Sequence, residues 1–259
     1  MITNLTIFTS AICNLNCSYC YVKKSNELFE YDKQVVNSIL SNEYIYRFIK
    51  DFPESIDTLE TLEFWGAEPT IHLDLIASKL IDYKKAFKNL HKISFSSNYT
   101  LPNFIEQIKF LTQEMGRFKD TNWELYVQCS IDGSKEITDR NRGIGTTDKI
   151  INNINLLKTL DIPDNVSLLV ANKSTLSNEQ FGYLQDIANV ENYVNFLRDI
   201  LEYQTKNKKF WVTAPTCVEP YYYTKNDGIL FSKVVDNFIT ISKKMNMTCV
   251  PYVRNRKIK

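Results

Sequence analysis

The sequence predicts an α/β protein with parallel strands, because strand-like and helix-like segments alternate along it. Six short runs of β-branched and aromatic residues are each followed by a longer segment with helical spacing of its apolar residues. Strands separated by helices are typical of parallel sheets built from right-handed crossovers. No strand is followed by the glycine fingerprint of dinucleotide-binding folds, so the usual reason to choose an open doubly wound sheet over a barrel-like array is missing.

The six expected strands are short, and the segments between them are long enough for one helix each. The strands are expected at residues 5–9, 62–65, 92–96, 125–131, 166–171 and 210–213. The helices are expected at residues 32–50, 73–90, 102–115, 147–160, 177–203 and 229–245. Asp32 and Ser177 stand at expected helix starts and Asp148 lies in a first turn, where acidic or short polar side chains stabilise a helix.

Length and composition bound the class of protein. A chain of 259 residues with 44% hydrophobic and 13% aromatic residues is neither disordered nor a disulfide-stapled miniprotein. Its formal net charge of +1 gives no support to non-specific nucleic-acid binding. We expect one domain over residues 1–248, followed by a basic and extended tail over residues 249–259.

The sequence also predicts a cytoplasmic location. No segment approaches the roughly 20 apolar residues that a membrane span requires. The first eight residues have neither the basic region nor the long apolar region of a signal peptide. In a reducing compartment, clustered cysteines are more often metal ligands or redox groups than disulfides.

Three of the six cysteines, Cys13, Cys17 and Cys20, lie within eight residues directly after the first expected strand. They could be unrelated buried side chains, zinc ligands or ligands of an iron–sulfur cluster. A zinc site normally needs four ligands, but the only histidines, His72 and His91, lie inside a helical stretch, and no second Cys-x2-Cys pair exists. Three thiolates would leave one iron of a [4Fe–4S] cube with an open position, which is typical of reactive metal sites.

The Cys-x3-Cys-x2-Cys spacing resembles the loop of the radical S-adenosylmethionine enzymes. In that family the open iron chelates the amine and carboxylate of S-adenosylmethionine. An electron from the cluster then cleaves the sulfonium to give methionine and a 5′-deoxyadenosyl radical, which takes a hydrogen atom from the substrate. The resemblance implies that Cys13, Cys17 and Cys20 hold a [4Fe–4S] cluster, and that S-adenosylmethionine is the second cofactor.

Two further segments resemble motifs of this family. Gly66, Ala67 and Glu68, followed by a proline, are similar to the Gly-Gly-Glu-Pro turn whose backbone and glutamate bind the methionine amino group. Alanine in place of the second glycine preserves the backbone contacts provided that its φ is negative. Asn98 matches the family's Thr-Asn-Gly-Thr segment, whereas Tyr99 stands where the family has glycine.

After the fourth strand, a Ser-Ile-Asp-Gly segment starts at Ser130, and an Asp-Arg-Asn-Arg-Gly-Ile-Gly segment starts at Asp139. Both resemble the peptide-modifying branch of the family, which includes the anaerobic sulfatase-maturating enzymes. The resemblance implies that Ser130 binds the ribose hydroxyls, Arg142 the methionine carboxylate and Tyr19 the adenine region. The charged run could instead be a solvated loop, or Arg140 could replace Arg142.

The resemblance covers about residues 5–213 and implies the family's partial (β/α)6 barrel, with the cluster at the C-terminal mouth of the strands. Peptide-modifying relatives carry a C-terminal SPASM or twitch domain whose cysteines bind auxiliary clusters. Only Cys129, Cys217 and Cys249 remain here, and Cys129 is expected to point away from Ser130. We therefore expect a single cluster and no full SPASM domain.

The expected function is that of an oxidoreductase or peptide-modifying enzyme that abstracts hydrogen from a peptide or small molecule. A one-electron donor such as flavodoxin or ferredoxin is implied, and neither nucleic acid nor membrane is. The residues that act on the substrate are not identified, although Cys217, Glu219 and residues 221–223 could face it. A non-catalytic iron–sulfur module for electron transfer or structure is the alternative, and a zinc-binding interaction protein is a third.

Overall fold

We describe a computed structural model in which residues 1–10, 12–20, 38, 40–176, 183–217, 225–247 and 249–250 are placed. The larger elements alternate between strand and helix along the chain. In order they are β1 (Asn4–Ser10), α3 (Asn42–Asp51), α4 (Ser55–Thr58), β2 (Thr61–Gly66), η1 (Pro69–His72), α5 (Leu73–Ala86), β3 (Lys92–Ser97), α6 (Phe104–Gly116), β4 (Trp123–Ser130), α7 (Lys135–Arg142), α8 (Thr146–Thr159), β5 (Val166–Lys173), β6 (Thr175–Leu176), α10 (Ile187–Leu201), β7 (Tyr203–Gln204), β8 (Lys208–Thr213), β9 (Thr216–Cys217), α11 (Lys225–Lys244) and β10 (Cys249–Val250).

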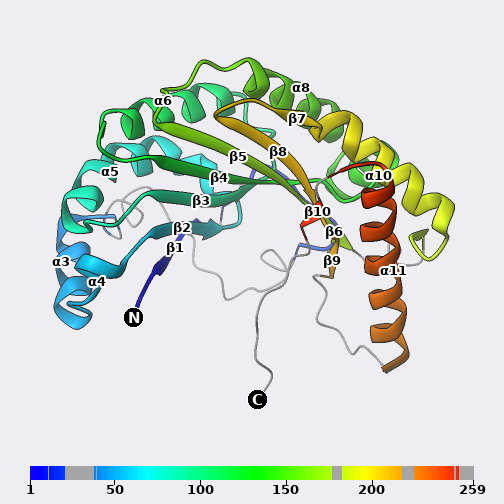
Figure 1. Cartoon of the computed structure of the whole chain (residues 1–259), viewed down its shortest axis with the longest axis horizontal. Helices are drawn as coiled ribbons and strands as arrows, with labels where there is room; N and C mark the ends of the chain where they lie inside the picture. The colour runs from blue at the N-terminus through cyan, green and yellow to red at the C-terminus, as the bar shows by residue number, and fades with distance from the viewer. Residues whose placement is uncertain are drawn as a thin grey trace.

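The main sheet is parallel and curved, with its helices on the convex side (Figure 1). Its strands are paired in the order β1-β2-β3-β4-β5-β8-β10, and β7 adds an antiparallel pair to β8. All six expected strands are present, each within two residues of its expected bounds. The α/β class and the partial (β/α)6 barrel are thus confirmed. The short strand β10 was not expected, because residues 249 and 250 were assigned to the tail.

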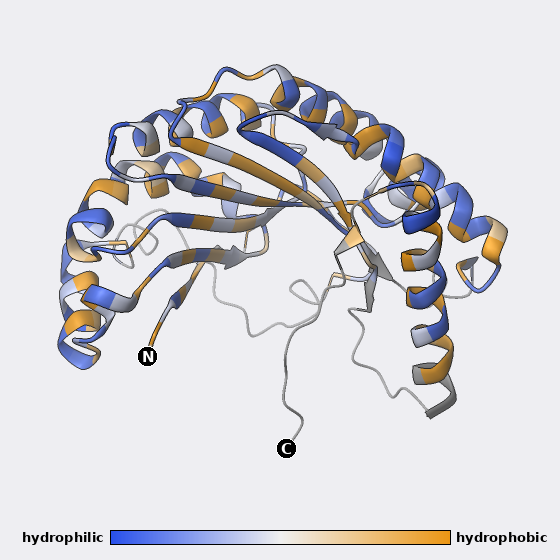
Figure 2. Cartoon of the chain, viewed as in Figure 1, coloured by the Kyte–Doolittle hydropathy of each residue, from blue (hydrophilic) through white to orange (hydrophobic). Residues whose placement is uncertain are grey.

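Burial alternates along the strands, as expected for a sheet that is covered by helices on one face. In β4 every second side chain, starting at Trp123 and ending at Cys129, is buried. The side chains between them, starting at Glu124 and ending at Ser130, are half-buried and lie on the opposite, concave face. Cys129 therefore points away from Ser130, as predicted. The helices carry both hydrophobic and hydrophilic residues, which suits elements with one side on the sheet and the other in solvent (Figure 2).

Side-chain caps mark several helix starts. Ser41 accepts a hydrogen bond from the N–H of Tyr44 at the start of α3, and Asp186 accepts one from Ala188 at the start of α10. The expected cap residues Asp32 and Ser177 lie outside the described residues. None of the described helices combines the length and the apolar character that crossing a membrane requires.

Helix α7 was not predicted, because its segment has only one strongly apolar residue, Ile137, and so no apolar periodicity. Most of the buried residues of α7 are polar. Thr138, Asn141 and Arg142 are buried with Ile137. Arg142 and Thr138 find hydrogen-bond partners outside the helix, in Asp132 and Gly133, and local sequence does not reveal such contacts.

Gly116 ends α6 at a point where Pro163 approaches its backbone. A Cβ atom on Gly116 would lie 2.4 Å from Cγ of Pro163. We expect Gly116→Ala to lower the free energy of unfolding by about 1–3 kcal/mol, as overpacking typically does. Lys109→Ala, on the exposed side of the same helix, should change it by less than about 0.5 kcal/mol. Urea denaturation measures both, and equal stabilities would contradict the close packing.

Candidate functional site

The segments that follow β1, β2, β3 and β4 line one cavity at the C-terminal end of the sheet, which is where parallel α/β folds place ligands. Its empty volume is about 820 Å³, including the solvent at its mouth. The structure brings all ten predicted site residues to this cavity. They are Cys13, Cys17, Tyr19, Cys20, Gly66, Ala67, Glu68, Asn98, Ser130 and Arg142.

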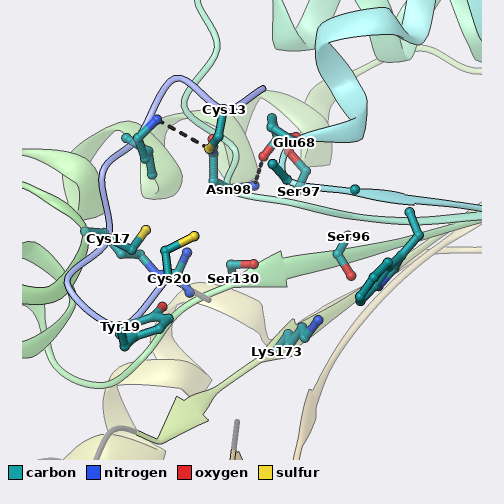
Figure 3. A pocket seen from close by; sticks show the side chains of 15 residues that line it. Cys13, Cys17, Tyr19, Cys20, Glu68, Ser96, Ser97, Asn98, Ser130 and Lys173 are labelled. Carbon is teal, nitrogen blue, oxygen red and sulfur yellow. Dashed lines mark hydrogen bonds between the residues drawn. The ribbon is translucent and has the colours of Figure 1, made fainter. Parts of the chain in front are cut away.

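Sequence reasoning gave no role to five other residues that line the cavity: Leu15, Trp65, Ser96, Ser97 and Lys173. Lys173 ends β5 and pairs in register with Ser130 of β4, so both side chains reach the cavity (Figure 3). The expected fifth strand stopped at Ala171. Extending it by two residues would have placed this lysine beside the predicted serine.

The cysteine loop is fixed to the rest of the site by backbone hydrogen bonds. The N–H of Glu68 donates to the carbonyl of Ile12 at 3.1 Å, and the N–H of Ser18 donates to the carbonyl of Asn141 at 2.9 Å. Between these anchors, the N–H of Cys20 donates to the carbonyl of Cys17 and closes a tight turn. The sulfur atoms of the three cysteines face the same space (Figure 3).

The thiols of Cys13 and Cys17 are partly buried, which disfavours their ionised form. Burial raises the pKa of Cys13, although hydrogen bonds from the N–H of Leu15 and the amide of Asn98 oppose the shift. Burial also raises the pKa of Cys17, to about 11, against the opposing charge of Arg142. A metal centre bound by these cysteines would stabilise their thiolates and release protons as it binds.

The arrangement of the three thiols bears on the kind of metal centre that they could hold. In the described part of the chain, no three His, Cys, Asp or Glu side chains converge closely enough to hold one metal ion. Neither His72, at the end of η1, nor His91, before β3, lines the cavity. An iron–sulfur cube offers a separate iron to each thiolate, so thiols spread around one cavity fit it.

Glu68 joins two of the turns that form the site, and its side chain is buried. Its carboxylate accepts hydrogen bonds from the hydroxyl and N–H of Thr70 and, at 2.8 Å, from the N–H of Asn98. Burial raises its pKa in spite of these bonds. Gly66 has φ 153°, and Ala67 is not among the residues with positive φ, so the backbone condition for the alanine is met. The Ser97 side chain is a further hydrogen-bond partner of this carboxylate, so an ammonium group bound there would share its oxygens with these donors.

Tyr99 adopts the backbone conformation that a glycine would favour. Its φ is 59°, in the left-handed region, which costs roughly 1–2 kcal/mol for a residue with a side chain. Its ring is fully buried, with its centroid 4.4 Å from that of Phe104. The ring packs in the core although its hydroxyl has no hydrogen-bond partner among the described residues, and the turn adopts this conformation without glycine.

Arg142 is held by a buried carboxylate. Its Nε and Nη2 atoms donate to Asp132 at 3.0 and 2.7 Å, and the Tyr19 hydroxyl donates to the same carboxylate at 2.8 Å. Burial alone would lower the pKa of Arg142, but the charge of Asp132 raises it overall. The guanidinium also lies over the Tyr19 ring, 5.6 Å from its centroid. The pair thus anchors the aromatic residue of the cysteine loop to α7.

The two arginines of the charged run lie in different surroundings. Arg140 is exposed and does not line the cavity, whereas Arg142 is buried and does. Asp139 accepts hydrogen bonds from the N–H groups of Gly145 and Thr147, and so caps α8. The run is a helix with structural contacts rather than a solvated loop. The role of Asp132 was missed, because its partners are brought together only by the fold.

A parallel partial barrel with a three-cysteine loop at its C-terminal mouth defines a class of enzyme fold. The profile of the Radical SAM superfamily matches residues 7–176, and the chain belongs to this superfamily. Membership implies a [4Fe–4S] cluster and S-adenosylmethionine as cofactors.

Three curated proteins are similar to this chain over about the same region. A serine-type anaerobic sulfatase-maturating enzyme of Bacteroides thetaiotaomicron is 30% identical over 166 residues, which are 62% of this chain and 37% of that protein. An uncharacterized protein of Methanocaldococcus jannaschii is 29% identical over 65% of this chain and 53% of its own length. A cysteine-type anaerobic sulfatase-maturating enzyme of Clostridium novyi is 28% identical over 64% of this chain and 42% of its own length. The matched region of this chain thus covers about half or less of the length of each of these relatives.

Proposed function

We propose that the protein cleaves S-adenosylmethionine reductively at one [4Fe–4S] cluster bound by Cys13, Cys17 and Cys20, and abstracts hydrogen from a peptide substrate. One observation carries the proposal. Three thiols face a cavity that also receives Glu68 and Ser130, and no other cysteine or histidine of the described residues lines it. The cluster would therefore keep one iron free of protein thiolates.

A [4Fe–4S] cluster with an open iron supplies the electron that cleaves the bound sulfonium cofactor. The chain's own residues would hold that cofactor. The Glu68 carboxylate accepts from its ammonium group, and the Ser130 hydroxyl bonds to the ribose hydroxyls. Arg142 uses two of its five N–H groups on Asp132, so it keeps donors for the methionine carboxylate. Tyr19 packs near the adenine.

A peptide or protein substrate is favoured over a small molecule. Two of the similar proteins are named for the maturation of sulfatases, which are themselves proteins. An external one-electron donor, of the flavodoxin or ferredoxin kind, would reduce the cluster. The candidate substrate-side residues 219 and 221–223 lie outside the described residues, and the side chain of Cys217 is not described.

Anaerobic reconstitution with iron and sulfide tests the proposal. The protein should gain the brown chromophore of a [4Fe–4S] cluster. With dithionite it should then convert S-adenosylmethionine to methionine and 5′-deoxyadenosine, measured by liquid chromatography, and release neither product without the reductant. A cluster that forms but never cleaves the cofactor would favour the non-catalytic module. A colourless protein that binds zinc would favour the interaction protein.

A further inference from the structure

The turn after β3 places an amide side chain against one of the proposed cluster ligands. The Nδ2 atom of Asn98 lies 3.6 Å from Sγ of Cys13, within hydrogen-bonding distance for sulfur. The N–H of Leu15 donates to the same sulfur at 3.4 Å. Cys13 therefore has two N–H donors directed at its sulfur, one from its own loop and one from another strand end.

The neighbours of Asn98 fix which way its amide points. Its Oδ1 atom faces the backbone N–H of Thr100 at 2.9 Å and the Thr100 hydroxyl at 2.7 Å. A backbone N–H can only donate, so the atom opposite it must be the amide oxygen. The NH2 group is thereby turned toward Cys13.

A closed ring of hydrogen bonds holds the amide in place. Asn98 donates from Nδ2 to Oδ1 of Asn14 at 2.8 Å, and Asn14 donates from its own Nδ2 to the Thr100 hydroxyl at 2.8 Å. The Thr100 hydroxyl completes the ring by donating to Asn98. Both N–H bonds and both acceptor positions of the Asn98 amide are thus used. Asn98 and Thr100 are also buried, so the donor to Cys13 has little freedom to turn away.

We propose that Asn98 sets the electron affinity of the cluster by donating this hydrogen bond to the Cys13 thiolate. This inference rests on the proposed function. An N–H donor stabilises negative charge on sulfur, and the reduced cluster carries one more negative charge than the oxidised cluster. The bond therefore favours the reduced cluster and raises its reduction potential, as hydrogen bonds to cluster sulfurs do. Asn98 is a positioning residue in this role, because it acts through Cys13.

A matched pair of variants tests the inference in the reconstituted full chain. Asn98→Ser and Asn14→Ser each remove one amide from the same ring, but only the first removes a donor to the Cys13 sulfur. We expect a redox titration followed by electron paramagnetic resonance to give a lower midpoint potential for Asn98→Ser than for the unmodified protein. Asn14→Ser should stay closer to the unmodified value. Equal shifts for the two variants would overturn the inference.

A spectroscopic measurement detects the hydrogen bond itself. After exchange into D2O, electron–nuclear double resonance of the reduced cluster should show deuteron couplings from both Leu15 and Asn98. Asn98→Ser should lose one coupling, whereas Asn14→Ser should keep both; an unchanged spectrum for Asn98→Ser would contradict the contact. If the serine variants do not fold, Asn98→Asp and Asn14→Asp replace them in this spectroscopic measurement alone, because the carboxylate introduced by Asn98→Asp would still accept both bonds from Thr100, whereas its charge would itself lower the potential.

The failure of this inference can be told apart from the failure of the proposed function. If the unmodified protein forms no [4Fe–4S] cluster, both fail together. If it forms a cluster and cleaves S-adenosylmethionine, but the Asn98 and Asn14 variants have the same potential, only the inference fails.

Discussion

Replacing Cys17 with alanine should abolish the iron–sulfur chromophore of the reconstituted protein, and Cys13→Ala and Cys20→Ala should do the same. Each change removes one of the three thiols that face the cavity, and two thiolates hold a cube poorly. Bound iron should fall from roughly four atoms per chain to nearly none. Visible absorbance and an iron assay under anaerobic conditions measure the loss.

Cys249→Ala is the matched control for these variants. Cys249 lies in β10 and does not line the cavity, so its replacement should leave the chromophore intact. If Cys249→Ala lost as much iron as Cys17→Ala, the assignment of the ligands would be wrong.

Arg142→Met should lower the free energy of unfolding by about 3–5 kcal/mol, because it leaves the carboxylate of Asp132 buried without its cation. The double variant Arg142→Met with Asp132→Asn should recover much of this loss, since it leaves no uncompensated buried charge. Urea denaturation of the cluster-free protein measures both. Arg140→Met, at an exposed position on the same helix, should cost no more than about 1 kcal/mol. Equal losses at Arg140 and Arg142 would contradict the buried pair.

The pair of Arg142 and Asp132 also affects how the measured affinity of an Arg142 variant for S-adenosylmethionine should be interpreted. Asp132 also accepts from the Tyr19 hydroxyl, and the neighbouring Ser18 bonds to α7. A variant of Arg142 can therefore weaken binding of S-adenosylmethionine in two ways, by removing a donor to its carboxylate and by releasing the cysteine loop. Asp132→Asn keeps the guanidinium but removes the charge that holds both Arg142 and Tyr19, so it tests the loss of this anchoring with the donor still present.

Local patterns were sufficient to predict the strands and the cysteine loop. The β-branched runs that form β1 to β5 are buried on one face. Burial requires apolar residues at these positions, and the same apolar residues predict the strands from the sequence. The ten predicted cavity residues were found because each lies near the end of such a strand or in a recognisable motif that follows one.

The remaining features depend on contacts between distant parts of the chain. Asp132 meets Tyr19 across 113 residues, and Asn98 meets Asn14 across 84. Helix α7 lacks apolar periodicity, and its buried Arg142 is held by Asp132. The two residues of β10 become a strand only by pairing with β8. Neither propensity nor spacing contains this information.

The central claim is that one iron of the cube has no protein thiolate and is the place where S-adenosylmethionine binds. Mössbauer spectroscopy of the protein reconstituted with ⁵⁷Fe, before and after addition of S-adenosylmethionine, tests it most directly. The account predicts that one iron of the four changes its isomer shift when the cofactor binds, while the other three keep theirs. A spectrum in which the cofactor alters no iron would contradict it.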